Sequence, residues 1–213
     1  MPDGWRSVRL DDVDPIAVVG GTLLWRPLRR TLDIGAFGMN AYVAPNAGDD
    51  VVEEHTEKVY GHEEVYLVLA GRATFTVDGE TLDAPTGTAV FIRDPTLKRH
   101  ARAEEPNTTV LAVGGPRDAA YEPSPWEWAF AAERHRAAGD YDAMVDEIAA
   151  GLELHPDNAS LLYDLGCAEA LAGRLDDALT HVTRALEQKP EWNDHASADP
   201  DLEAVRKLPG WTR

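Results

Sequence analysis

The chain has 213 residues, of which 44% are hydrophobic and 27% are charged, and its formal net charge is −18. This length is enough for one large domain or two modest ones with buried cores. So acidic a surface disfavours binding to nucleic acid or to an anionic membrane. The single cysteine, Cys167, excludes an internal disulfide. Because the sequence has no apolar run of membrane-spanning length and no recognisable secretory leader, we expect a cytoplasmic protein.

Apolar residues in the first half of the chain come in short runs that Gly, Pro and Asp interrupt. Runs of this kind predict β-strands, and their close spacing is typical of an all-β sandwich or barrel. The predicted strands cover residues 22–25, 36–44, 51–53, 64–69, 73–77, 89–93 and 109–113. The pair Asp78-Gly79 predicts a tight hairpin with two positive φ angles, which joins the strand at 73–77 to the chain around Thr81 and Leu82.

Side chains on the strand at 64–69 alternate between two faces, so Glu64, Tyr66 and Val68 share one of them. In an enclosed barrel this face would line a pocket and would supply it with a carboxylate and a phenol. The alternative is that Glu64 and Tyr66 face solvent. The strand therefore offers a candidate pocket wall without deciding between the two orientations.

Two pairs of residues carry a resemblance to the cupin superfamily. Glu64 and Gly71 match the spacing of a Glu and a Gly in its first motif, and Pro95 and His100 match a Pro and a His in its second. The resemblance covers about residues 20–115 and implies a jelly-roll β-barrel with its site inside. It also implies one divalent metal ion, of iron, manganese, nickel or zinc, which two His and a Glu of the first motif and a His of the second would bind.

The sequence departs from this pattern where the two His of the first motif should stand. Those positions hold Lys58 and Tyr60, or Glu57 and Val59 if the longer spacing is used. Nearby side chains offer a replacement set of metal ligands: His55, His62, Glu64 and His100, with Glu57 as a further donor.

A barrel that has lost the metal is the alternative. In that case Tyr60, Glu64, Tyr66 and His100 line a cavity for a small polar molecule. Lys58 then forms an ion pair with Glu64 where the metal would sit. If the barrel is an enzyme, Glu64 and His100 are the expected catalytic residues, around a metal in oxygenation or isomerisation, or as a metal-free acid–base pair.

Helix-forming residues dominate after a Pro-rich linker at 123–125. The predicted helices cover residues 126–138, 141–154, 160–172, 175–188 and 200–208. Gly139 and Gly173 stand one 34-residue period apart, as do Pro156 and Pro190. This pattern resembles the tetratricopeptide repeat, whose helix pairs pack on one another, and the resemblance implies a surface for a peptide, a protein or a second copy of the chain.

Together these patterns predict an α+β protein of two domains. A cupin-like jelly-roll barrel would occupy residues 1–122, and an all-α array similar to tetratricopeptide repeats would occupy residues 123–213. Because two repeats are few for a free-standing array, we expect Trp126 to pack on the barrel. The resemblance to cupins, many of which pair through their sheets, implies a homodimer.

Two functions fit this organisation. Because half of the metal motif is missing, the sequence favours a small-molecule-binding or regulatory protein with a helical module for interaction or dimerisation. The alternative is a metal-dependent cupin enzyme of the dioxygenase or isomerase type, with its site in the barrel. Neither function involves nucleic acid or a membrane.

Overall fold

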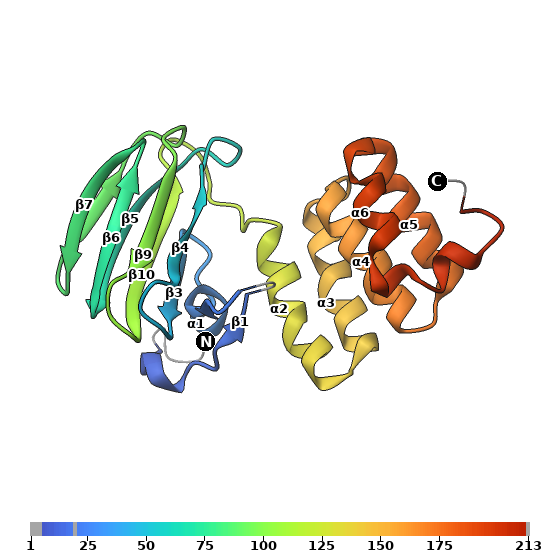
Figure 1. Ribbon diagram of the computed structural model, residues 1–213, viewed down its shortest axis with the longest axis horizontal. Helices are drawn as coiled ribbons and strands as arrows, with labels where there is room; N and C mark the ends of the chain where they lie inside the picture. The colour runs from blue at the N-terminus through green and yellow to red at the C-terminus, as the bar shows by residue number, and fades with distance from the viewer. Residues whose placement is uncertain (1–5, 19–20, 212–213) are drawn as a thin grey trace. The chain divides into compact units, whose positions relative to one another are not determined.

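The computed structural model describes residues 6–18 and 21–211 and divides into two compact units. A β-rich unit ends at Pro123 and a helical unit begins at Ser124 (Figure 1). The boundary expected from the sequence lies one residue earlier, after Glu122. Within the described ranges, every helix is too short or too polar to cross a lipid bilayer.

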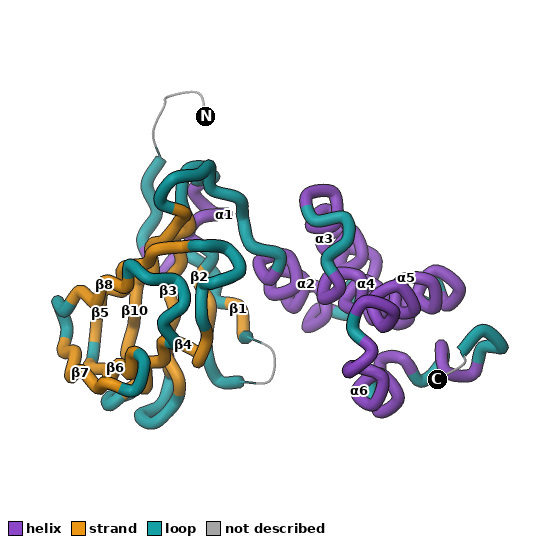
Figure 2. The backbone as a smooth tube through the Cα atoms, turned by 90° about the horizontal axis from the view of Figure 1, so that it is seen from above, coloured by secondary structure: helices purple, strands orange, loops and turns teal. Residues whose placement is uncertain are grey.

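The β-rich unit consists of two antiparallel sheets that form two layers (Figure 2). The first has six strands in the order β1-β2-β3-β10-β5-β8, and the second has four in the order β4-β9-β6-β7. The first sheet contains β1 (Ile16–Ala17), β2 (Leu24–Arg26), β3 (Gly38–Ala44), β5 (His62–Ala70), β8 (Ala89–Ile92) and β10 (Thr108–Pro116). The second contains β4 (Asp50–His55), β6 (Arg72–Val77), β7 (Glu80–Pro85) and β9 (Arg99–Ala103). A 3-10 turn, η1 (Leu10–Asp12), and a short helix, α1 (Leu28–Leu32), complete the unit.

The hairpin predicted between β6 and β7 is confirmed. Asp78 and Gly79 have φ angles of 49° and 88°, and the two strands pair up to the residues on either side of them. Gly71, which joins β5 to β6, has a φ of 73°, and a Cβ there would lie 2.5 Å from Oγ1 of Thr108. Gly71 therefore combines a left-handed backbone with a close approach that excludes any side chain.

Apolar side chains from both sheets meet between the layers and form the core of this unit. Val51 and Phe75 of the second sheet and Tyr66 and Val110 of the first are at most 1% exposed. The alternation predicted for β5 is confirmed, because Tyr66 and Val68 both lie in this core. Polar residues that share this face of β5 are therefore directed between the sheets.

Strand β9 is not among the strands that the sequence predicts. It pairs with β4 and β6, and Arg99, Ala101 and Ala103 are buried on one of its faces, while His100 and Arg102 alternate with them on the other. The motif match selects His100 by its distance from Pro95. It does not use the alternation of buried and exposed residues along 99–103, which is the signal for the strand. The register of β9 decides which of its side chains enters the core.

Four long helices form the helical unit, and each packs on the next one along the chain. They are α2 (Trp126–Ala138), α3 (Tyr141–Leu154), α4 (Ala159–Leu171) and α5 (Leu175–Gln188). The side chains of Asp140 and Asn158 cap α3 and α4 by accepting hydrogen bonds from backbone N–H groups of the first turn. The starts of α3 and α5 keep the 34-residue period seen in the sequence.

The helix expected over residues 200–208 is replaced by shorter elements. The structure has α6 (Asn193–Ala198) and the 3-10 turns η2 (Pro190–Trp192), η3 (Pro200–Leu202) and η4 (Val205–Lys207). Leu202, Val205 and Leu208 are spaced three residues apart, and all pack into the core of the helical unit. This spacing matches the three residues per turn of a 3-10 helix.

Gly166 of α4 lies so close to α5 that a Cβ there would collide with Val182 and would lie 3.0 Å from the carbonyl oxygen of Ala178. We expect Gly166→Ala to lower the free energy of unfolding of the helical unit by about 1–2 kcal/mol, since overpacking costs about 1–3 kcal/mol and alanine restores up to about 1 kcal/mol of helix propensity. Urea unfolding followed by far-UV circular dichroism measures the change. Ser160→Ala, at an exposed position of the same helix, is the control. An unchanged midpoint in Gly166→Ala would contradict this packing.

Candidate functional site

Polar side chains come together on the inner face of the two sheets, and we call them the inner polar cluster. The cluster consists of His55 at the end of β4, Glu57 in the following turn, His62, Glu64 and Tyr66 on β5, and Arg99 on β9. Strand alternation directs the members on β5 and β9 inward. The turn is fixed by a hydrogen bond of 2.9 Å that the N–H of Glu57 donates to the carbonyl oxygen of Pro95.

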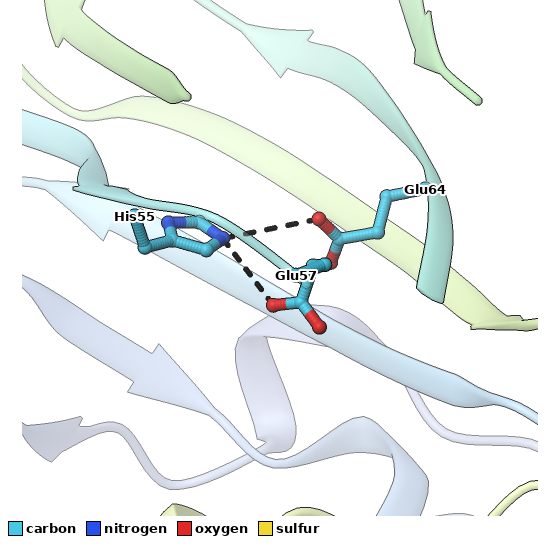
Figure 3. A group of neighbouring side chains, drawn as sticks. All are labelled: His55, Glu57 and Glu64. Atoms are coloured by element: carbon cyan, nitrogen blue, oxygen red, sulfur yellow. Dashed lines mark ion pairs between the residues drawn. The ribbon is translucent and has the colours of Figure 1, made fainter. Parts of the chain in front are cut away.

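One ring nitrogen of His55 faces the carboxylates of both Glu57 and Glu64 (Figure 3). Its Nε2 lies 3.5 Å from Oε1 of Glu57 and 3.8 Å from Oε2 of Glu64. Its Nδ1 lies 2.7 Å from the carbonyl oxygen of Glu53, which can only accept a hydrogen bond, so Nδ1 carries a proton. The tautomer of a neutral His55 is therefore fixed, with the lone pair of Nε2 directed at the two carboxylates.

The titration of His55 and Glu64 reflects this mutual contact. Burial disfavours the charged form of both groups, but their contact outweighs it. The pKa of Glu64 lies below its ordinary value, since His55, Tyr66 and Arg99 stabilise the carboxylate, and the pKa of His55 lies above its ordinary value. Burial and the adjacent Glu64 carboxylate raise the pKa of Tyr66 well above its usual range, so its hydroxyl remains a donor to Glu64. The cluster thus holds an ionised carboxylate that attracts positive charge.

Arg99 is a fully buried cation with unfilled hydrogen-bonding capacity. Its Nε lies 3.9 Å from Oε2 of Glu64, and its Nη2 donates a long hydrogen bond of 3.4 Å to the carbonyl oxygen of Asp94. Among residues 6–18 and 21–211, nothing hydrogen-bonds to Nε or Nη1, and the same holds for Oδ1 of Asn40 and Oε2 of Glu57. Nδ1 of His62 is 3.1 Å from that oxygen of Glu57 without the geometry of a hydrogen bond. Buried polar atoms in native proteins are usually paired with protein or with ordered water, so these atoms are where water or a ligand would bind.

The structure does not bring His100 to Glu64, which corrects the expectation that these two side chains converge. His100 lies on the outer face of β9, where its Nε2 is 2.8 Å from Oδ1 of Asp50. The residue of β9 that reaches Glu64 is Arg99, one position earlier. The sequence signal for this register was the alternation of the small apolar Ala101 and Ala103 with larger polar residues.

The other residues proposed from the sequence lie at the edge of the cluster. Lys58 is exposed, and the cation beside Glu64 is Arg99 instead. Tyr60 is 37% exposed, and its ring centroid lies 5.7 Å from that of His62. His62 is buried and also stacks on Tyr121, with ring centroids 5.6 Å apart. Of the four ligands predicted for a metal, His55 and Glu64 are therefore brought together directly, and His62 adjoins them through Glu57.

The donor set of His55, Glu57 and Glu64 fits a divalent metal ion. One ligand atom from each residue lies within 4.8 Å of the others, and all three side chains are at least partly buried. One imidazole and two carboxylates suit manganese, iron, nickel or zinc. The carbonyl of Glu53 would orient His55 from the outer shell, as is usual for histidine ligands.

A second group of possible ligands lies in the helical unit, where Cys167, Asp199 and Asp201 approach one another within the same limit of 4.8 Å. Two of its members already have partners. Nη2 of Arg136 donates to Asp201 over 2.7 Å, and the hydroxyl of Tyr163 donates to Asp199 over 2.9 Å. Burial and the neighbouring acids raise the pKa of the Cys167 thiol, which disfavours the thiolate that a metal requires. This group is therefore a structural network.

Comparisons with known proteins return no matching family model and no matching curated protein. Solved structures do match about half of the chain. A predicted oxalate decarboxylase from Thermotoga maritima is 20% identical, with 53% of this chain and 100% of that chain covered and a TM-score of 0.44. A cupin protein from Bacteroides fragilis is 20% identical, with 53% and 92% covered and a TM-score of 0.39. A sugar phosphate isomerase of a cupin superfamily from Silicibacter pomeroyi is 15% identical, with 53% and 76% covered and a TM-score of 0.44.

Proposed function

We propose that the β-rich unit is a cupin-type barrel that binds a small polar molecule with the help of one divalent metal ion. His55, Glu57 and Glu64 would hold the ion, because a nitrogen and two carboxylate oxygens of these residues lie within 4.8 Å of one another. Three protein ligands leave positions on such an ion open for a ligand or substrate. An ion bound in this way supplies Lewis acidity and attracts an anionic or carbonyl oxygen.

The observation that carries the proposal is the orientation of His55. Its Nδ1 proton is committed to the carbonyl of Glu53, so Nε2 has either a lone pair or a second proton. A lone pair directed at the carboxylates of Glu57 and Glu64 would be repelled by them. The position between the three side chains therefore favours a positive charge. A second proton on Nε2 supplies one such charge, whereas a divalent ion supplies two and also accepts the lone pair of Nε2.

Elemental analysis of the intact chain, purified without a metal-affinity tag, tests the proposal. We expect close to one equivalent of iron, manganese, nickel or zinc per chain, removable by a chelator and restored by adding back the ion. A chain that is metal-free as purified and binds none of these ions afterwards would contradict the proposal. In that case the metal-free alternative described next would stand.

The second candidate function is a barrel that binds its small molecule without a metal. It is favoured by Arg99, whose buried guanidinium places a permanent positive charge 3.9 Å from Glu64. Arg99 thus lies beside Glu64, in the role that the sequence predicts for Lys58 in a metal-free barrel. Glu64, Tyr66 and Arg99 would then bind the ligand through hydrogen bonds alone.

A further inference from the structure

We propose that the small molecule bound in the barrel carries a carboxylate and that Arg99 binds this group. This inference rests on the proposed function and names the chemical class of its ligand. Arg99 is 0% exposed, so its charge has no access to solvent. A guanidinium stays protonated at any physiological pH, and a buried one is tolerated only where acceptors surround it.

The described side chains do not supply those acceptors. Oε2 of Glu64 is too distant for a hydrogen bond, at 3.9 Å from Nε, and already accepts from the hydroxyl of Tyr66. The carbonyl oxygen of Asp94 accepts only from Nη2, over 3.4 Å. Nε and Nη1 are left without partners although both are buried. Ordered water or a bound ligand supplies the oxygen atoms that they need, and the carboxylate oxygens of a ligand match the donors of a guanidinium in geometry and charge.

The charge balance of the cluster favours a monoanion. The carboxylates of Glu57 and Glu64 contribute two negative charges, whereas a divalent ion and Arg99 contribute three positive ones. One positive charge is left over when the ion is bound, and a single carboxylate neutralises it. A phosphate dianion would bring an excess negative charge next to two carboxylates that are only 12% and 14% exposed, and such burial of unbalanced charge is costly.

The carboxylate of the ligand would then be shared between the ion and Arg99. His55, which would hold the ion, is 3.8 Å from Oε2 of Glu64, and Nε of Arg99 is 3.9 Å from the same atom. A carboxylate has two oxygens, so one can accept from the guanidinium while the other faces the ion. The rest of the ligand is not specified by these contacts.

Calorimetric titration of the intact, metal-loaded chain tests this inference with matched pairs of probes. Acetate is compared with acetamide, and glycolate with glycolamide, so that each pair differs in charge and hardly in size. We expect the carboxylates to bind about tenfold or more tightly than the amides, since hydrogen bonds between two charged groups are stronger than those to a neutral acceptor. Equal binding of acids and amides would overturn the inference and would leave the proposed function intact.

Variants of residues on β9 test whether the preference for carboxylates depends on Arg99. Arg99→Met should abolish the preference for carboxylates, and Arg99→Lys, which keeps the charge in case the first variant does not fold, should weaken carboxylate binding several-fold by losing the planar donor pair. Arg102→Met is the control, because Arg102 lies on the outer face of the same strand. A preference that survives Arg99→Lys at full strength would overturn the inference. Metal content is measured on the same samples, so a chain that binds carboxylates at Arg99 but no ion would contradict the proposed function alone.

Discussion

Replacing His55 with alanine is expected to weaken the binding of a divalent ion by about 100-fold or more, since losing even an outer-shell partner costs about 10- to 100-fold. His55 supplies the nitrogen ligand of the proposed site and lies 3.5 Å from Glu57 and 3.8 Å from Glu64. Its side chain is 35% exposed, so alanine should leave the core intact. Titration calorimetry of the metal-free chain with Mn²⁺, Ni²⁺ or Zn²⁺ measures the affinity.

His100→Ala is the matched control, because the sequence-based ligand set contains both histidines. The Nε2 of His100 is 2.8 Å from Asp50, on the face of β9 opposite to Arg99, and its loss should leave metal affinity unchanged. Glu64→Gln, which removes a charge while keeping the shape, should reproduce the loss seen for His55→Ala. If the two histidine variants lost affinity equally, the register of β9 described above would be contradicted.

The sequence predicts the residues of this site that lie on β5, because that strand is long and its ends are clearly marked. On β5 the alternation of polar and apolar residues places Tyr66 and Val68 in the core, and Glu64 on their face follows from the same period. Strand β9 is only five residues long and contains two arginines and a histidine, so its composition does not predict a strand. Motif spacing then selected His100, although alternation with Ala101 assigns the inward position to Arg99.

Two other features of the site depend on contacts between distant segments. Two backbone hydrogen bonds bring Glu57 into the cluster. Its N–H donates to the carbonyl oxygen of Pro95 over 2.9 Å, and its carbonyl oxygen accepts from the N–H of Gly61 over 2.7 Å. No local periodicity encodes that turn. Arg99 was missed because arginine is mostly found at protein surfaces, and a buried one is recognised only from its surroundings. For both Glu57 and Arg99, the sequence gives the type of side chain but does not give its burial or its contacts.

Asp164→Asn is expected to stabilise the helical unit, and the gain should grow as the pH rises from 5 to 8. Asp164 lies on α4, where burial, with repulsion from Glu133 and Asp199, raises the pKa of its carboxyl to about 7, against the opposing charge of Arg136. The folded chain therefore holds a proton on this carboxyl that the unfolded chain releases near pH 4. Asparagine has the shape of the protonated acid and never ionises, so it removes the cost of charging this position.

The direction of the pH dependence follows from proton binding. Between about pH 4 and pH 7 the folded chain binds more protons at Asp164 than the unfolded chain does, so the free energy of unfolding falls as the pH rises through this window. Below about pH 4 Asp164 is protonated in both states, so the favourable contribution of its proton to the free energy of unfolding is fully present. Above about pH 7 it is ionised in both states, so the cost of its buried charge no longer changes with pH. At 1.36 kcal/mol per pKa unit, the advantage of Asp164→Asn should increase by about 3 kcal/mol between pH 5 and pH 8.

Urea unfolding followed by far-UV circular dichroism at both pH values measures this difference, because the helical unit dominates the signal. Asp146→Asn, which removes an exposed carboxylate from α3, controls for the general relief of negative charge in so acidic a chain. A pH-independent gain for Asp164→Asn, or the same gain for both variants, would contradict a buried proton at Asp164. The test bears on the whole network around Arg136, since that single guanidinium is bound to Asp201 over 2.7 Å and to Glu133 over 3.3 Å and offsets only part of the cost of charging Asp164.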